Sequence, residues 1–159
     1  RDHSQNALVM DGQDIFKKAV SHMAAAATEV LEKAGMTVAD VDLVVPHQAN
    51  QRIMEAVARR LRLSDTQLFS NIESYGNTSA ASIPLALDEA IGTGRVQSGA
   101  IVLLVAFGGG LSWGAVLMKW GDRVEPIGTS GAELDATDQD VFSLLADNFN
   151  YFGGGPRRD

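Results

Sequence analysis

The stretch Ile101–Phe107, with the sequence IVLLVAF, is the segment from which the fold of this chain is predicted. A β-strand that is apolar at every position has to be covered on both faces, as in sheets that carry helices on either side. The glycines Gly108–Gly110 follow at once, and Leu111–Trp120 is predicted as a second apolar strand. Because the connection is so short, we expect the two strands to form an antiparallel hairpin.

Strands and helices alternate along the chain before this hairpin. Apolar residues recur at three- and four-residue spacing in the predicted helices, whereas the predicted strands are short apolar runs. The predicted strands are Asn6–Met10, Val41–Val45 and Leu68–Ile72, and the predicted helices run from Phe16 to Ala34, from the cap Asn50 to about Leu61, and from the cap Ser79 to Ile91. The order β-α-β-α-β-α-β-β predicts an α/β fold with a mixed, mostly parallel sheet and helices on both faces.

The composition of the 159-residue chain excludes several classes of function and site. It has no cysteine, which excludes disulfides, thiolate metal sites and a cysteine nucleophile within this chain, and we expect no metal site. The net charge of −7 argues against nucleic-acid binding. No apolar run approaches the ~20 residues of a membrane span. The first residues, RDHSQNALVM, show no apolar leader, so we expect no membrane and a cytoplasmic location.

The charge distribution divides the chain near Gly121. Residues 1–120 carry 10 basic and 12 acidic side chains, a net charge of −2. Residues 121–159 carry 3 basic and 8 acidic side chains, a net charge of −5. We expect residues 1–120 to form the α/β domain. Residues 121–159 are predicted as an acidic, glycine-rich extension with one short amphipathic helix in TDQDVFSLLADNF, Thr137–Phe149.

His47 and Asn77 are the candidate site residues. His47 follows the predicted strand that ends at Val45, and Asn77 lies in the loop SYGNTSAAS before the last predicted helix. Ligands of open α/β sheets gather at the carboxyl ends of strands, where we expect both residues. From residue chemistry alone, a structural histidine and a capping asparagine are the more ordinary interpretations.

Four segments in order carry a family resemblance: MDGQDIFKKAV, PHQANQRI, YGNTSAASIPLALDEA and VLLVAFGGGLSWGAVLMKW. They make the chain from about Met10 to Trp120 resemble the C-terminal half of β-ketoacyl-acyl-carrier-protein synthase III. The resemblance implies a thiolase-like half-domain. It also implies an acyltransferase that initiates fatty-acid synthesis. That enzyme joins an acyl-coenzyme A primer to malonyl-acyl carrier protein by decarboxylative Claisen condensation, with these thioesters as substrates and no cofactor.

The resemblance also assigns site residues. A Cys–His–Asn triad performs the reaction in this family, and His47 and Asn77 match its His and Asn. Gly109, in the glycine turn, matches the residue whose backbone N–H contributes to the oxyanion hole. The family's nucleophilic cysteine lies in an N-terminal half that does not occur in this sequence. The implied partners are therefore this Cys-bearing half and a second copy of the full enzyme in a homodimer, and this chain alone is predicted to be inactive.

The helix NQRIMEAVARRLR is basic in an acidic chain. Arg52 and Arg59 share a helix face, with Arg60 beside them. A basic face suits an anionic partner such as acyl carrier protein or the coenzyme A phosphates, although a solvated face explains Arg59 and Arg60 equally well. The resemblance implies that the segment after the histidine binds these partners, namely Gln48, Ala49, Asn50, Gln51 and Arg52.

Two other functions fit the same residues. One is a non-catalytic or regulatory thiolase-fold subunit that retains His47 and Asn77. The other is a related polyketide-priming acyltransferase with the same triad. The residues do not distinguish primer chain length or branching, nor a fragment from a cleaved product or a separate subunit.

Overall fold

The computed structural model describes residues 11–125 together with Gly131, Asp138, Asp140 and Ser143. Asp11–Ile127 form one compact unit, which contains every element named below. The strand predicted at Asn6–Met10 and most of the helix predicted at 137–149 lie outside the described residues. The domain boundary near Gly121 therefore stays a prediction.

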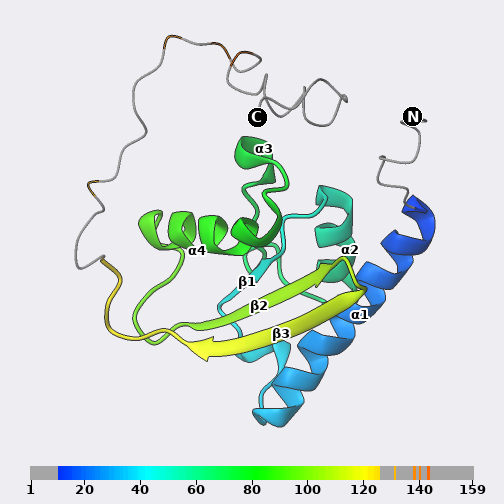
Figure 1. Ribbon diagram of the computed structural model, residues 1–159. Coiled ribbons are helices and arrows are strands. Elements are labelled where there is room, and N and C mark those ends of the chain that lie inside the picture. Colours follow the sequence, from blue (N-terminus) through cyan, green and yellow to red (C-terminus); the bar gives the residue numbers. More distant parts are fainter. Residues whose placement is uncertain (1–10, 126–130, 132–137, 139, 141–142, 144–159) are drawn as a thin grey trace, which may run out of the picture. The chain divides into compact units, whose positions relative to one another are not determined.

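A three-stranded mixed sheet forms the centre of this unit (Figure 1). Its strands lie in the order β1 (Leu43–Pro46), β2 (Ile101–Gly108) and β3 (Ser112–Lys119). β1 and β2 run parallel, whereas β2 and β3 form an antiparallel hairpin in which Phe107 pairs with Trp113. The predicted apolar strand and the predicted hairpin are both confirmed.

The strand predicted at Leu68–Ile72 is wrong. Only one bridge, between Leu68 and Val44, continues the sheet beyond β1. Next to it the backbone N–H of Phe69 donates to the carbonyl of Val44 at 2.9 Å. The chain then leaves the sheet and forms the short helix α3 (Ile72–Tyr75).

The buried side chain of Gln48 explains why the strand stops. Its Oε1 accepts the backbone N–H of Asn71 at 3.1 Å. Its Nε2 donates to the carbonyls of Pro46 at 2.8 Å and of Phe69 at 3.4 Å. A side-chain amide thus takes the backbone hydrogen bonds that a longer strand would form, and the sequence pattern of apolar residues gives no sign of this.

Two helices, α1 (Gly12–Lys33) and α2 (Gln51–Leu61), cover one face of the sheet (Figure 1). The 3₁₀ turn Val38–Asp40 connects α1 to β1. As predicted, Asn50 caps α2, because its side chain accepts the backbone N–H of Arg52 at 3.0 Å. The apolar stripes of both helices pack with strand residues into one core, which includes Met23, Ala27, Leu31, Val44, Val57, Leu103, Val105 and Phe107.

The helix α4 (Ser82–Gly92) covers the opposite face, so the prediction of helices on both faces is confirmed. Its start at Ser79 is wrong, since a 3₁₀ turn (Ser79–Ala81) precedes it and Ser79 has a φ of 53°. Oδ1 of Asn77 accepts the backbone N–H of Ser79 at 2.9 Å in an Asx turn, and neither the 3₁₀ turn nor α4 has a side-chain cap. The second core contains Leu43, Val45, Phe69, Ala86, Ala90, Val96, Ala100 and Val102.

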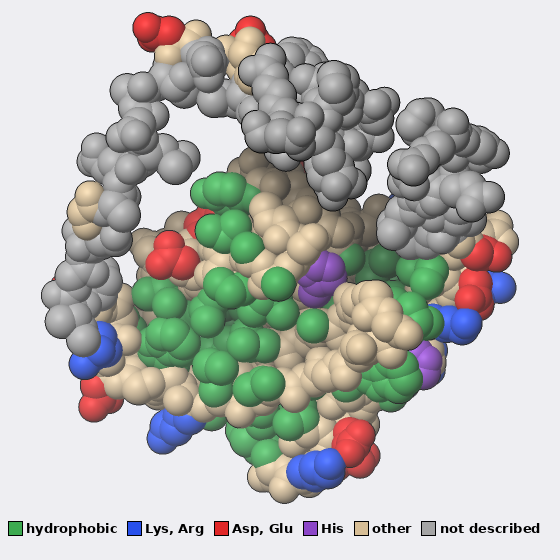
Figure 2. Space-filling model, in the orientation of Figure 1, with side chains coloured by type: hydrophobic (Ala, Val, Ile, Leu, Met, Phe, Trp, Pro, Cys, Tyr) green, Lys and Arg blue, Asp and Glu red, His purple; other side chains and the backbone are tan. Residues whose placement is uncertain are grey.

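An apolar surface runs over α4 and the β2–β3 hairpin (Figure 2). Leu85 on α4 is 40% exposed, and Trp113 and Val116 on β3 are 48% and 54% exposed. A helix that is apolar nearly all round would be covered on every side, but the described residues cover mainly the face that carries Ala86 and Ala90. Trp113 lies on the α1 face of the hairpin, against His22, whereas Val116 points to the α4 face. We call Leu85 and Val116 the apolar surface below.

Candidate active site

The predicted catalytic residues line one cavity of about 510 Å³. His47 follows β1 directly, Asn77 lies between α3 and the 3₁₀ turn before α4, and Gly109 lies between β2 and β3. Segments far apart in sequence therefore meet at the end of the sheet. The cavity is completed by Ser79, Ala80, Ser82, Ile83, Ala106, Phe107, Gly108, Ser112, Trp113 and Gly114.

His47 is held by its backbone and by its ring. Its backbone N–H donates to the carbonyl of Val105 at 2.8 Å, which extends the pairing of β1 with β2 by one residue. Its Nδ1 lies 2.6 Å from Oγ of Ser82, the first residue of α4. Burial lowers the pKa of His47, because the imidazolium loses hydration in this half-buried position. The ring is therefore neutral at neutral pH.

Ser82 is a site residue that the sequence analysis missed. It is 2% exposed, and its Oγ also accepts the backbone N–H of Gln48 at 3.2 Å. Ser82 and His47 are 35 positions apart, and a serine among small residues carries no local sign of such a partner. The only signal is topological, because the end of β1 has to lie against the first turn of a helix that covers the sheet.

The amide of Asn77 has a fixed orientation. A backbone N–H only donates, so its bond from Ser79 places Oδ1 on that side and Nδ2 on the other. Nδ2 donates to the carbonyl of Ala49 at 3.3 Å, a long hydrogen bond. Within the described structure, the second N–H of this amide has no protein acceptor and is left for a ligand.

Gly109 and two aromatic rings shape the rest of the cavity. A Cβ added at Gly109 would find no atom within 4 Å, so a ligand can approach the backbone there. Phe107 and Trp113 give the cavity an apolar side. The ring of His22, from α1, stacks on Trp113 with 3.9 Å between ring centroids, which ties this side to the helix behind it.

The residues predicted to bind the carrier protein differ in exposure. Gln48 is 1% exposed, so its side chain cannot contact a partner directly and acts within the fold instead. Asn50 is exposed but is engaged as the cap of α2. The Oε1 of Gln51 accepts the hydroxyl of Ser70 at 3.0 Å. Ala49 is half-buried.

The arginines of α2 also differ from one another. The Arg52 guanidinium is exposed and lies 5.9 Å from the ring centroid of Phe16. Arg59 forms an exposed ion pair with Glu55 at 3.8 Å, so its charge is partly compensated. Arg60 lines a different hollow. Of the three, Arg52 lies nearest to His47 in the sequence, and a role in binding an anionic partner stays a prediction.

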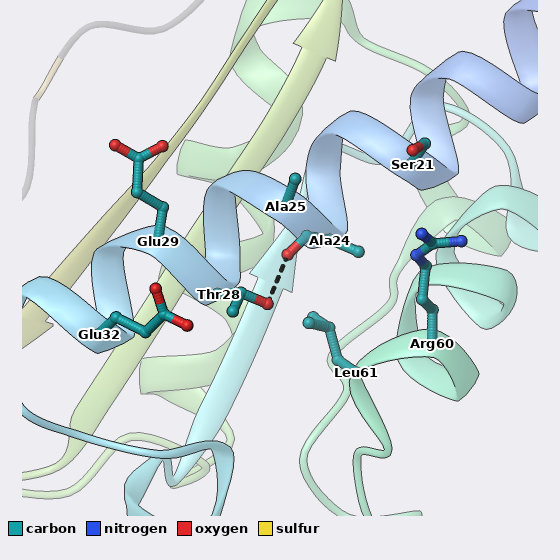
Figure 3. Close-up of a pocket in the computed structure, with 8 residues that line it drawn as sticks. All are labelled: Ser21, Ala24, Ala25, Thr28, Glu29, Glu32, Arg60 and Leu61. Carbon is teal, nitrogen blue, oxygen red and sulfur yellow. Dashed lines mark hydrogen bonds between the residues drawn. The ribbon is translucent and has the colours of Figure 1, made fainter.

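A second hollow, of about 360 Å³, lies between α1 and α2 (Figure 3). The Thr28 hydroxyl donates to the carbonyl of Ala24 at 3.0 Å, and Glu29 forms an ion pair with Lys33 at 2.6 Å. Figure 3 shows Glu29 and Arg60 well apart, so the polar groups do not converge on one point. We therefore assign the site to the cavity at His47.

In the described part of the chain, no group of three or more His, Asp or Glu is placed to hold a metal ion. No helix in that part is both long enough and apolar enough to cross a membrane.

The mixed sheet with helices on both faces, and a His and an Asn meeting at its end, define a thiolase-like α/β half-domain. The family described as 3-oxoacyl-[acyl-carrier-protein] synthase III C terminal matches residues 31–120. The chain belongs to this family.

Named relatives and solved structures agree with this assignment. The chain is 48% identical, over 134 residues, to β-ketoacyl-[acyl-carrier-protein] synthase III 2 of Vibrio vulnificus, covering 84% of this chain and 37% of the relative. The structure of 3-oxoacyl-[acyl-carrier-protein] synthase III from Aquifex aeolicus matches with a TM-score of 0.69 and 53% identity, over 70% of this chain and 36% of that one. The structure of β-ketoacyl-[acyl-carrier-protein] synthase III from Thermus thermophilus matches with a TM-score of 0.71 and 51% identity, over 74% of this chain and 37% of that one. The chain thus spans little more than a third of the length of these relatives.

Proposed function

We propose that this chain is the C-terminal half of an enzyme that initiates fatty-acid synthesis by joining an acyl-coenzyme A primer to malonyl-acyl carrier protein. The observation that carries the proposal is the convergence of His47 and Asn77 on one cavity, with Nδ1 of His47 and Oδ1 of Asn77 both engaged by the fold. Asn77 therefore offers an N–H group to a ligand, and His47 offers its Nε2. The names of the relatives supply the reaction class.

The condensing step needs such donors. When the malonyl thioester loses carbon dioxide, the electron pair of the broken C–C bond moves to the α-carbon and the thioester oxygen. N–H groups of His47 and Asn77 stabilise this enolate oxygen. A neutral imidazole and an amide are far weaker acids than an imidazolium, so they favour attack of the carbanion on the acyl group over its protonation. The lowered pKa of His47 supports this role, because it keeps the ring neutral.

The acyl group has to be carried by another segment of protein, because this sequence contains no cysteine. We infer that a Cys-bearing N-terminal half holds the acyl group as a thioester, and that the backbone N–H of Gly109 contributes to its oxyanion hole. The greater length of the relatives supports a second half. The proposal extends to a cytoplasmic homodimer of the two-half enzyme without a bound cofactor.

The test separates the two half-reactions in the assembled enzyme. We expect His47→Ala and Asn77→Ala each to slow malonyl decarboxylation by roughly a hundredfold, because each removes one donor to the enolate. Acylation of the partner cysteine should persist, because it uses the cysteine and the oxyanion hole. Release of labelled carbon dioxide measures the first step and intact-protein mass measures the second. Gln97→Ala, at an exposed position outside the cavity, is the control, and wild-type decarboxylation in either site variant would refute the assignment.

A second candidate function is the priming of polyketide synthesis. The structure of a priming β-ketosynthase from a polyketide biosynthetic pathway matches with a TM-score of 0.69 and 43% identity, over 73% of this chain and 35% of that one. The same triad would then serve a different primer and carrier protein. Rates measured with a series of acyl-coenzyme A primers and with fatty-acid and polyketide carrier proteins distinguish the two functions.

A further inference from the structure

The hydroxyl of Ser82 lies between two nitrogen atoms, both from the segment that follows β1. The backbone N–H of Gln48 is 3.2 Å from Oγ, and Nδ1 of His47 is 2.6 Å from it. Ser82 is buried, so water does not compete for this hydroxyl. The question is which of the two partners receives the hydroxyl proton.

The donors and acceptors allow one arrangement. The backbone N–H of Gln48 can only donate, so Oγ of Ser82 accepts there. The hydroxyl hydrogen then needs an acceptor, and in the described structure the only other partner of Oγ is Nδ1 of His47. If Nδ1 carried a proton, this buried hydroxyl would have no acceptor, which costs about 1–3 kcal/mol.

We propose that Ser82 is a positioning residue that donates to Nδ1 of His47 and thereby holds the neutral imidazole with its proton on Nε2. The inference rests on the proposed function, since it gives His47 the N–H that the enolate needs. No described protein group is bonded to Nε2, and the ring lines the cavity. A single hydrogen bond thus fixes both the orientation of the ring and the atom that donates.

A hydroxyl suits this task better than a carboxylate. A carboxylate beside Nδ1 would accept a proton from it and stabilise the imidazolium, which is an acid strong enough to quench a carbanion. A serine hydroxyl is neutral and donates to the neutral ring. In this respect Ser82 and the backbone N–H of Ser79 act alike, because each engages one side of a catalytic group and leaves the donating side to the ligand.

The tautomer can be measured without any assay of activity. The chain contains three histidines, so it can be labelled with ¹⁵N-histidine and reconstituted with the unlabelled N-terminal half. The spectrum of His47→Gln then identifies the signals of His47. Above the pH at which the ring titrates, we expect a protonated Nε2 and an unprotonated Nδ1. A protonated Nδ1 in the neutral ring would overturn the proposal.

Substitutions test the role of the hydroxyl. Ser82→Ala should lower kcat for decarboxylation by about tenfold, the lower end of the loss seen when a group that orients a metal-ligating histidine is removed, with little change in KM for malonyl-acyl carrier protein. Its ¹⁵N spectrum should show mixed tautomers, and Ser82→Thr should restore both readouts. The control is Ser98→Ala, which removes a hydroxyl bonded to Asp122 at 2.8 Å outside the cavity.

The outcomes are separable. A folded Ser82→Ala variant with the wild-type spectrum and the wild-type kcat would overturn the positioning role. If Ser82→Ala does not fold, the wild-type spectrum alone decides. Failure of the proposed function shows differently, as full decarboxylation by His47→Ala, whichever tautomer the spectrum reports.

Discussion

The side chain of Gln48 accepts the backbone N–H of Asn71 at 3.1 Å, and this bond joins the end of β1 to the segment that leads to Asn77. Gln48 adjoins His47 in sequence, so the two candidate catalytic residues are fixed to each other through a buried side chain. Its other bonds, to the carbonyls of Pro46 and Phe69, use the remaining hydrogens of the amide.

Gln48→Leu should therefore destabilise the assembled enzyme by about 2–6 kcal/mol. The leucine fills a similar volume but leaves the N–H of Asn71 and the carbonyl of Pro46 buried without partners, at about 1–3 kcal/mol each. Thermal unfolding followed by circular dichroism measures the loss. Gln51→Leu, at an exposed position on α2, is the matched control. Equal melting temperatures for the two variants would contradict the structural role of Gln48.

The rate of decarboxylation should depend on the charge of His47. Burial lowers the pKa of His47, so the ring stays neutral to a lower pH than an exposed histidine, whose pKa is about 6.5. We expect the rate to fall on the acid side with an apparent pKa below that ordinary value. The pH–rate profile of the decarboxylation step measures it, and an acid limb centred above the ordinary value would contradict the desolvated site.

The free energy of unfolding should also depend on the protonation of His47. The folded-state pKa of His47 is lowered, so as the pH falls below the ordinary histidine value the unfolded chain takes up a proton first and the folded state loses stability. Above that value His47 has no such effect. His47→Gln should therefore lose less stability than the wild type between neutral and mildly acidic pH, as measured by denaturant unfolding at each pH.

The sequence predicted what depends on periodicity and on local capping. Ile101–Phe107 had to be covered on both faces, and Asn50 precedes a helix that needs a cap. The failures involve side chains that replace backbone groups. Gln48 ends the strand predicted at Leu68–Ile72, and Asn77 binds the backbone N–H of Ser79 in an Asx turn where Ser79 was expected to cap a helix. Such choices are made by tertiary contacts, which a local pattern does not contain.

In the candidate site, too, the sequence predicted some residues and missed others that depend on tertiary contacts. His47, Asn77 and Gly109 were found through the family resemblance, and the structure places them on one cavity. Ser82 could not be found in this way, because its role depends on a contact between the end of β1 and the first turn of α4. Gln48 was predicted to bind a partner because the family resemblance assigns this role to the segment after His47, and this stays a prediction; in the fold its side chain is 1% exposed and bonds to neighbouring backbone groups.

Arg52→Glu should raise KM for malonyl-acyl carrier protein by about tenfold at low salt, since it replaces attraction with repulsion near the cavity. The effect should shrink as salt is added, because exposed charges are screened over about 8 Å at physiological ionic strength. Lys33→Glu makes the same change of charge 17 residues beyond Phe16 on α1, roughly 25 Å from the ring that Arg52 approaches, and should have little effect. Equal KM values for the two variants would show that Arg52 is only a solvated residue.

The isolated chain should be poorly soluble and inactive with acyl-coenzyme A and malonyl-acyl carrier protein. Leu85 and Val116, on the face of the sheet that carries α4, leave the apolar surface open to water, and exposed apolar surface of this kind favours association. Light scattering and size-exclusion chromatography of the chain expressed alone measure the first property. Coexpression with a Cys-bearing N-terminal half should rescue both solubility and turnover.

A paired substitution makes this last prediction specific to the apolar surface. Leu85→Lys with Val116→Lys places charge at two exposed apolar positions, 40% and 54% exposed, so it should keep the isolated chain in solution. The same change should weaken rescue by the N-terminal half, because two lysines would have to lose their hydration in the interface. Lysines at the exposed polar positions Gln13 and Gln97 add the same charge elsewhere and should change neither property. A monodisperse, cooperatively melting monomer of the unmodified chain would contradict the half-domain interpretation, and turnover by that monomer would also refute the need for a cysteine from another segment.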